Sequence, residues 1–236
     1  MDIVRAFTFP FEDRAWVEKL LITLVISAIT IILSPLFVGL LGWAALLGYQ
    51  VDLVRNWRQE RPNPLPAWNN FSRLLSQGFY PLVAILLYTV PNLIISGTIM
   101  IFGQNLGAGW VGSTLTLFFS CCMFPILLLY NLISLPMFAL ALGRFVDEPR
   151  LGVFFEIGHL LVTLRDHLST TIMFLVGLLI VGFVFGFLGT LTLGLLPLAL
   201  GAPVLGALTG QLALVMLGKP KRSEGDRHEP AKPKRR

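Results

Sequence analysis

The side chains that could support catalysis or hold a metal are concentrated in residues 144–167. His159 and His167 are eight positions apart, so a helix would place them on roughly one face. Together with Glu156 they could begin a metal site, and nearby carboxylates could pair with a histidine for acid–base chemistry at lipid headgroups. The carboxylates of this segment are Asp147, Glu148, Glu156 and Asp166. Solvated polar residues on the wet face of an interfacial helix explain the same pattern.

Other signatures of chemistry do not occur in the sequence. It contains no H-E-x-x-H, G-x-S-x-G, P-loop or dinucleotide-binding fingerprint. The two cysteines, Cys121 and Cys122, are adjacent within an apolar run, which excludes a disulfide framework and a zinc site. We therefore predict no catalytic residue, no cofactor and no bound metal.

A second set of candidates lies within the apolar part of the chain, where polar side chains are rare. These residues are Tyr88, Asn92, Tyr130 and Asn131. Hydrogen bonding between two helices is the first interpretation, and lining of a pore is the second. The long apolar stretches contain no acidic or basic residue, which argues against ion-coupled transport and leaves channel-like or passive transport open.

The elements that must position these residues are membrane helices. Of the 236 residues, 55% are hydrophobic and 13% are charged, whereas a soluble domain carries about 25% charged residues. No Asp, Glu, Lys or Arg occurs in residues 20–51, 74–143 and 167–218. Each stretch is longer than the about 20 residues of one crossing, and lipid requires a helical backbone. The predicted fold is an all-α integral membrane protein.

The distribution of basic residues predicts how the helices are connected. If all charged segments are cytoplasmic, each apolar stretch becomes a hairpin whose outer turn contains no Lys or Arg. The outer turns then fall at 34–42, 103–112 and 189–201. The prediction is six transmembrane helices in three hairpins, at roughly 17–34, 36–55, 79–101, 112–142, 168–188 and 191–217. Alternatively, residues 20–48 form one tilted helix that is kinked at Pro35, and the N-terminus lies outside.

The charged segments divide the chain into three parts. Residues 1–19 interleave aromatic and charged side chains, as do 150–166 and the shorter 68–75, and we expect amphipathic interfacial helices there. Residues 20–217 form the transmembrane domain. Residues 218–236, rich in Pro, Lys and Arg, are expected to be a disordered basic cytoplasmic tail that attracts anionic headgroups. The tail lacks aromatic residues, which argues against specific nucleic-acid recognition.

Glycine and proline recur at spacings that indicate turns and close helix contacts. Two pairs have the G-x-x-x-G spacing, which brings helices together within the chain or between copies: Gly182 with Gly186, and Gly206 with Gly210. Two sets share the same Pro–Gly–Gly spacing: Pro35, Gly39 and Gly48, and Pro197, Gly201 and Gly210. The second observation suggests a duplicated turn and return helix, with chance similarity between Gly-rich segments as the rival explanation.

One part of the sequence, residues 47–91, has a recognisable arrangement. Gly48-Tyr49 precedes a helix end with Arg55 and Arg58, and then come the block PLPAWNNF at 64–71 and a helix with Gly78 and Pro91. This arrangement resembles the prokaryotic multi-pass family catalogued as domain of unknown function 4013, over most of residues 5–217. Members often carry acidic residues around the tryptophan, where this chain has Ala67, Asn69 and Asn70. The resemblance implies a multi-pass fold and a membrane location, and it implies no activity.

These observations favour a non-enzymatic, multi-pass protein of the cell membrane that acts as a scaffold or accessory protein, or by interacting with lipid. Its charged loops and C-terminus are expected to be cytoplasmic. The expected partners are membrane lipids, a second copy of the chain or another membrane protein. A channel or uncoupled transporter is the first alternative, and an interfacial lipid-modifying enzyme is the second.

Overall fold

The computed structural model describes residues 1–105 and 109–220. Every regular element within these residues is a helix. Five helices are long and apolar enough to cross a membrane, which confirms the predicted all-α membrane protein. They are α2 (Trp16–Leu33), α4 (Phe71–Asn105), α5 (Trp110–Phe145), α7 (Leu168–Leu191) and α8 (Leu195–Leu217). The predicted tail beyond residue 220 lies outside the described residues.

The sixth predicted crossing, 36–55, corresponds to α3 (Gly39–Arg58), which is not among these five helices. The second half of α3 carries Asp52, Arg55 and Arg58. The helix nevertheless lies at the centre of the bundle, where it contacts α2, α4, α5 and α8. Because these neighbours bury most of its residues from Ala44 to Arg58, α3 can carry charged residues near its end and still run through an apolar bundle.

Helices that are neighbours in sequence pair as hairpins: α2 with α3, α4 with α5, and α7 with α8. In the first hairpin, α2 ends at Leu33, a 3-10 turn (Ser34–Leu36) follows, and Phe37 adopts a left-handed conformation with φ 59°. The alternative of one continuous helix over 20–48 is therefore wrong. In the third hairpin, Leu193 and Gly194 are both left-handed.

The predicted duplication of the first and third turns is also wrong. Pro35 lies in the 3-10 turn, before the left-handed residue of its hairpin, whereas Pro197 lies in the first turn of α8, after the left-handed residues of its hairpin. A Cβ on Gly39 would lie 2.6 Å from the backbone of the turn, whereas nothing lies within 4 Å of a Cβ on Gly201. The shared spacing therefore reflects Gly-rich apolar sequence and not a shared turn geometry.

Short helices occupy the charged segments. The N-terminal segment forms α1 (Ile3–Thr8) and a 3-10 helix, η1 (Phe9–Glu12), and α1 packs on α8. Residues between α5 and α7 form η3 (Leu151–Phe155) and α6 (Ile157–Asp166), which buries Leu160 and Leu164 on one side. Residues 71–75, expected to belong to a separate interfacial helix, are instead the first turn of α4.

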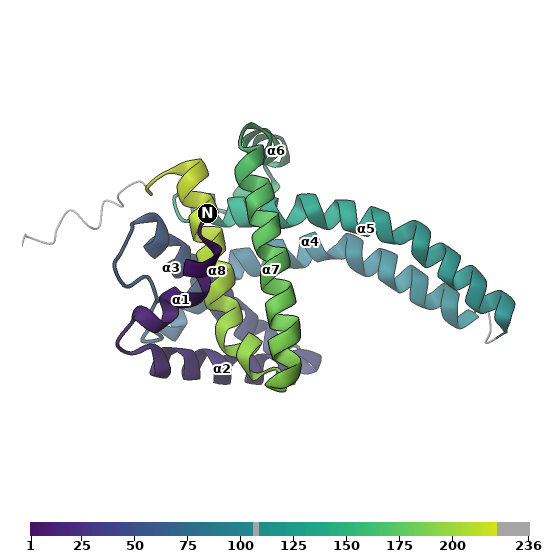
Figure 1. Ribbon diagram of the computed structural model, residues 1–236, viewed down its shortest axis with the longest axis horizontal. Coiled ribbons are helices and arrows are strands. Elements are labelled where there is room, and N and C mark those ends of the chain that lie inside the picture. Colours follow the sequence, from purple (N-terminus) through teal and green to yellow (C-terminus); the bar gives the residue numbers. More distant parts are fainter. Residues whose placement is uncertain (106–108, 221–236) are drawn as a thin grey trace, which may run out of the picture.

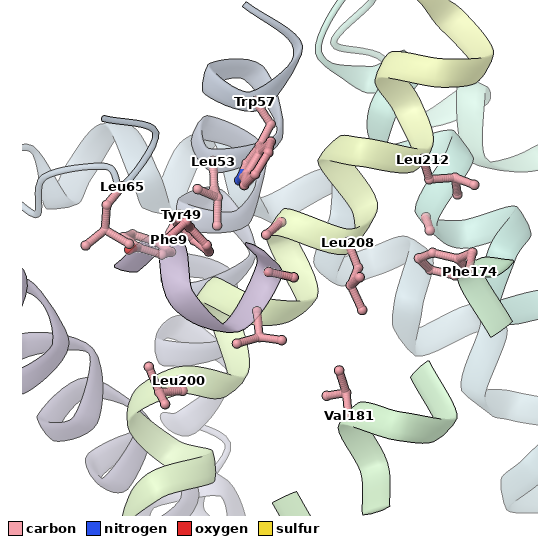
Figure 2. Close-up of a cluster of buried hydrophobic side chains, with 14 of the residues drawn as sticks. Phe9, Tyr49, Leu53, Trp57, Leu65, Phe174, Val181, Leu200, Leu208 and Leu212 are labelled. Atoms are coloured by element: carbon pink, nitrogen blue, oxygen red, sulfur yellow. The ribbon is translucent and has the colours of Figure 1, made fainter. Parts of the chain in front are cut away.

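The largest core cluster surrounds α8. Figure 2 shows that η1, α3 and α7 contribute side chains toward it, including Phe9, Trp57 and Phe174. The rings of Phe9 and Trp57 meet edge to face at 5.4 Å. Figure 1 shows that α4 and α5 run side by side and extend away from the rest of the molecule as a two-helix arm. In the same view, α7 and α8 run crosswise to this arm.

Candidate functional site

The residues that carry the family resemblance fold into a joint between α2, α3 and α4. The Tyr49 ring stacks on the Trp68 ring, with centroids 4.6 Å apart and planes at 8°. The Trp68 Nε1–H donates to Thr23 Oγ1 at 3.1 Å, and Lys19 Nζ donates to the Leu65 carbonyl at 2.9 Å. The loop after α3 is thereby fixed to α2 on one side and to α3 on the other.

Glycine is required where α3 meets α4, because the two backbones touch. A Cβ on Gly48 would lie 1.9 Å from the Leu74 carbonyl oxygen, and a Cβ on Gly78 would lie 1.7 Å from the Ala44 carbonyl oxygen. Both distances are far below van der Waals contact, and backbone atoms cannot move aside as the end of a side chain can. The structure thus places Gly48 and Gly78 on facing sides of one close helix crossing.

A buried arginine at the end of α3 forms hydrogen bonds with the ends of α5 and α8. Arg58 is 1% exposed. Its Nη1 donates to the Gly143 carbonyl and to Asp147 Oδ2, both at 2.8 Å, and its Nε donates to the Gly218 carbonyl at 2.9 Å. Because the carbonyl ends of α5 and α8 carry partial negative charge, the guanidinium ion compensates both at once.

Near the start of α2, Asp13 forms an ion pair with Lys19. The Asp13 carboxylate accepts hydrogen bonds from Lys19 Nζ at 2.6 Å and from the Ala15 N–H at 2.9 Å. Burial raises the pKa of Asp13, but these two hydrogen bonds outweigh it, and the pKa lies below its ordinary value. The ionised form is thus preferred where the N-terminal segment meets α2.

The predicted chemical candidates of residues 144–167 lie around Arg144. Glu156 pairs with Arg144 at 2.8 Å and with Arg150 at 2.9 Å, and His159 Nδ1 lies 3.4 Å from Arg144 Nη1. The hydrogen bond from Arg144 is the main reason that the pKa of Glu156 is lowered. His167 is held separately, with Nδ1 3.1 Å from the Thr163 carbonyl. In the part of the chain that the structure describes, no three His, Cys, Asp or Glu side chains are grouped to hold a metal ion.

The four polar candidates of the middle hairpin join its two helices. Asn92 and Asn131 exchange reciprocal amide hydrogen bonds of 3.1 and 3.0 Å. The Tyr130 hydroxyl donates to the Tyr88 carbonyl, and the Tyr88 hydroxyl donates to the Phe154 carbonyl, both at 2.7 Å. These bonds link α4 to α5 and to η3 beside it.

Breaking the amide pair is expected to loosen the α4–α5 arm. Asn92→Leu removes both amide hydrogen bonds to Asn131 and leaves that side chain only its bond to the Leu127 carbonyl, and the expected loss of unfolding free energy is about 1 kcal/mol. The double variant Asn92→Leu/Asn131→Leu removes both polar groups and should be closer to the wild type. Thermal unfolding of the two single variants and the double variant in detergent gives the coupling energy, and strictly additive losses would contradict the pairing.

The two G-x-x-x-G pairs have different environments. Gly206 and Gly210 face α3, where an added Cβ would lie 2.6 Å from the Leu53 and Trp57 side chains, respectively. Gly182 and Gly186 lie on the outer face of α7, where a Cβ would meet nothing within 4 Å. Only the α8 pair therefore forms a close helix contact within the described chain.

A cavity of about 610 Å³ lies between the six long helices, α2, α3, α4, α5, α7 and α8. We call it the central cavity. Most of its wall is aliphatic or aromatic, with contributions such as Leu46 from α3, Leu82 from α4, Phe138 from α5 and Phe174 from α7. Among the described residues that line it, none is ionisable. The polar candidates of the α4–α5 arm are not part of this lining.

The side of α2 that faces the bundle is polar, and the sequence analysis missed this feature. Thr23, Ser27 and Thr30 are buried, whereas Val25 and Ile32 on the opposite side are exposed. Polar residues face inward because helices in a membrane have apolar lipid outside and hydrogen-bond partners inside. The spacing of 4 and 3 residues between these hydroxyl side chains is the helical signal that could have revealed the stripe.

The helices and the central cavity together define an all-α, multi-pass membrane protein whose interior contains a mainly apolar cavity with no ionisable side chain among its described lining residues. The chain belongs to the family described as "Protein of unknown function (DUF4013)", whose model matches residues 29–194. This match confirms the resemblance, and it includes the Tyr49–Trp68 joint and both glycines of the α3–α4 crossing. Comparisons with curated proteins and with solved structures gave no significant match.

Proposed function

We propose that the protein is a non-enzymatic, lipid-binding protein of the cell membrane, which holds the apolar part of a lipid in the central cavity. The observation that carries this proposal is the cavity itself. Its volume of about 610 Å³ lies within the range of roughly 300–1,000 Å³ that is usual for small-molecule sites. An apolar cavity of this size is unfavourable for water, which needs polar partners, and favourable for an acyl chain.

The surroundings of the cavity support lipid as its occupant. The helices that enclose it expose large apolar side chains on their outer faces, including Ile32 on α2, Leu87 on α4 and Leu179 on α7. Hydrocarbon therefore surrounds the bundle at the level of the cavity, and lipid is the most abundant ligand available there. In this proposal, the Arg58 contacts and the Tyr49–Trp68 joint fix the helices around the binding space.

Filling the cavity with a side chain tests this function. Gly201 lines the cavity, and nothing lies within 4 Å of a Cβ placed on it, so the ring of Gly201→Phe can enter the space without displacing a neighbour. The wild type, purified in a mild detergent, is expected to retain bound lipid in native mass spectrometry, and Gly201→Phe is expected to lose most of it.

Gly182→Phe provides the matched control, because the same substitution falls on the outer face of α7, which is equally open. This variant should retain as much lipid as the wild type. Equal lipid retention in Gly201→Phe and the wild type, or a wild type that retains none, would overturn the proposed function.

We further propose that the charged ends of the helices, with both termini, lie on the cytoplasmic side. The Asp2 backbone N–H donates to Gln211 Oε1 at 2.7 Å, so the N-terminus lies near the C-terminal part of α8. Lys219 pairs with Glu60 after α3. The basic residues that follow would add about 1 kcal/mol each of attraction to anionic lipid where they approach the surface.

Thiol labelling tests this orientation. Val4 is 72% exposed, so Val4→Cys, in a chain whose Cys121 and Cys122 are replaced by Ser, provides an accessible thiol. A membrane-impermeant maleimide should label it only after the cells are permeabilised. Labelling in intact cells would place the N-terminus outside and reverse the proposed orientation.

A further inference from the structure

We propose that the lipid held in the central cavity carries an uncharged hydrogen-bonding group, such as a hydroxyl or an ester, which binds to Ser27, Gln50 and Thr209. This inference deepens the proposed function and rests on it. It identifies the class of lipid and the side chains that select it.

These three polar side chains have no hydrogen-bond partner among the residues that the structure describes. Ser27 and Thr209 are 7% and 8% exposed, respectively, and both line the cavity. Within the described part of the chain, the side chains of Ser27, Gln50 and Thr209 form no hydrogen bond. Gln50 is half-buried. Buried polar groups are nearly always hydrogen-bonded, so two buried hydroxyl groups without a partner, with an unpaired amide beside the same cavity, indicate a polar ligand.

Other hydroxyl side chains on α2, near Ser27, do have hydrogen-bond partners. Thr23 donates to the Lys19 carbonyl at 2.8 Å, and Thr30 donates to the Ile26 carbonyl at 2.6 Å. Within the cavity, Thr89 is similarly satisfied, because it donates to the Ile85 carbonyl at 2.7 Å. Ser27 and Thr209 therefore differ from these other hydroxyl side chains, because their hydroxyl groups remain available to a ligand in the cavity.

The three residues come from three helices, α2, α3 and α8, that surround one space. Each can both donate and accept a hydrogen bond, since two are hydroxyls and one is an amide. A ligand hydroxyl or an ester carbonyl matches this set. Because none of the described residues that line the cavity is ionisable, a carboxylate, phosphate or amine would be buried there without a counter-charge, which is strongly unfavourable.

The polar residues must also supply the selectivity. Lipid tails are as apolar as leucine, so the apolar wall barely distinguishes a bound chain from a chain in the bilayer. A hydrogen bond inside a membrane protein contributes roughly a fivefold preference. Loss of one polar residue should therefore weaken the preference for a polar lipid and leave the binding of a plain hydrocarbon chain unchanged.

Photolabelling of the purified full-length protein in nanodiscs tests the inference. Three diazirine probes with the same chain are used: a long-chain alcohol, the corresponding carboxylate and the corresponding alkane. The wild type is expected to be labelled most strongly by the alcohol. Ser27→Ala, Gln50→Leu and Thr209→Val should each reduce labelling by the alcohol roughly fivefold, with labelling by the alkane unchanged.

Thr89→Val is the matched control, because it removes a hydroxyl from the same cavity that already has a partner. It should leave labelling by the alcohol unchanged. A triple variant combines Ser27→Ala, Gln50→Leu and Thr209→Val. Equal labelling by the alcohol in the wild type and this triple variant, or preferred labelling by the carboxylate, would overturn this inference while cavity binding of lipid stands. If Gly201→Phe reduces no probe, the proposed function fails and this inference fails with it.

Discussion

Gly78→Ala is expected to prevent the formation of a stable bundle, although it adds a single methyl group. The added Cβ would lie 1.7 Å from the Ala44 carbonyl oxygen and 2.6 Å from the Gly48 nitrogen, and both are backbone atoms of α3. The helices would have to separate along their crossing, which also disrupts the stacking of Tyr49 on Trp68 beside it. Overpacking usually destabilises by about 1–3 kcal/mol, and a clash with backbone lies at or above the upper end.

Size-exclusion chromatography and thermal unfolding in detergent measure this effect. Gly97→Ala is the control, because Gly97 lies in the same helix and nothing lies within 4 Å of a Cβ placed there. That variant should be as stable as the wild type, or slightly more stable because alanine favours a helix by up to about 1 kcal/mol over glycine. If the two variants unfold at the same temperature, α3 and α4 do not cross as closely as described.

Much of this fold could be predicted from the sequence, since the signals involved are strong and local. Charge-free stretches longer than one crossing require several membrane helices, and uncharged turns between them predict hairpins. Each of the six predicted crossings corresponds to a helix of the structure. The boundary of α4 was harder to place, because Phe71, Leu74 and Leu75 are amphipathic in sequence and continue directly into the apolar part of the helix.

The packing of the helices could not be predicted in the same way. In a membrane, both the inner and the outer faces of a helix can be apolar, so hydropathy does not indicate which face turns inward. The glycines illustrate this limit. A Cβ on Gly206 would lie 2.6 Å from Leu53 of α3, whereas a Cβ on Gly182 would meet no described neighbour within 4 Å, although both glycines belong to G-x-x-x-G pairs. The position of a partner helix determines the difference, and spacing within one helix contains no information about it.

The residues that line the central cavity could not be predicted from the sequence either. From the sequence, Asn92 and Asn131 are candidates for lining residues, because amides are conspicuous in an apolar run. In the structure these amides bind to each other, whereas the lining includes the inconspicuous Ser27 and Thr209. Ordinary serine and threonine acquire a distinct role only when several helices meet around one space, and that arrangement is a property of the tertiary fold.

Arg58→Met is expected to lower the unfolding free energy by about 3 kcal/mol. The substitution removes donors from the carbonyls of Gly143 and Gly218 and from Asp147 Oδ2. Methionine can fill the space of the buried arginine stem, but it cannot compensate the carbonyl ends of α5 and α8. Arg58→Lys keeps the charge and should give an intermediate loss, since a single ammonium group cannot reproduce the geometry of a guanidinium that reaches three acceptors.

The matched control for this prediction is Arg150→Met, because Arg150 also forms ion pairs but its side chain is 60% exposed. Exposed ion pairs contribute little to stability, so this variant should unfold near the wild-type temperature. Equal unfolding temperatures for Arg58→Met and Arg150→Met would show that the bundle does not depend on the contacts of the buried guanidinium. A loss of stability in Arg58→Met alone would instead indicate that the Arg58 side chain holds α3, α5 and α8 together at the charged end of α3. It would also explain how a helix with charged residues occupies the centre of a membrane protein.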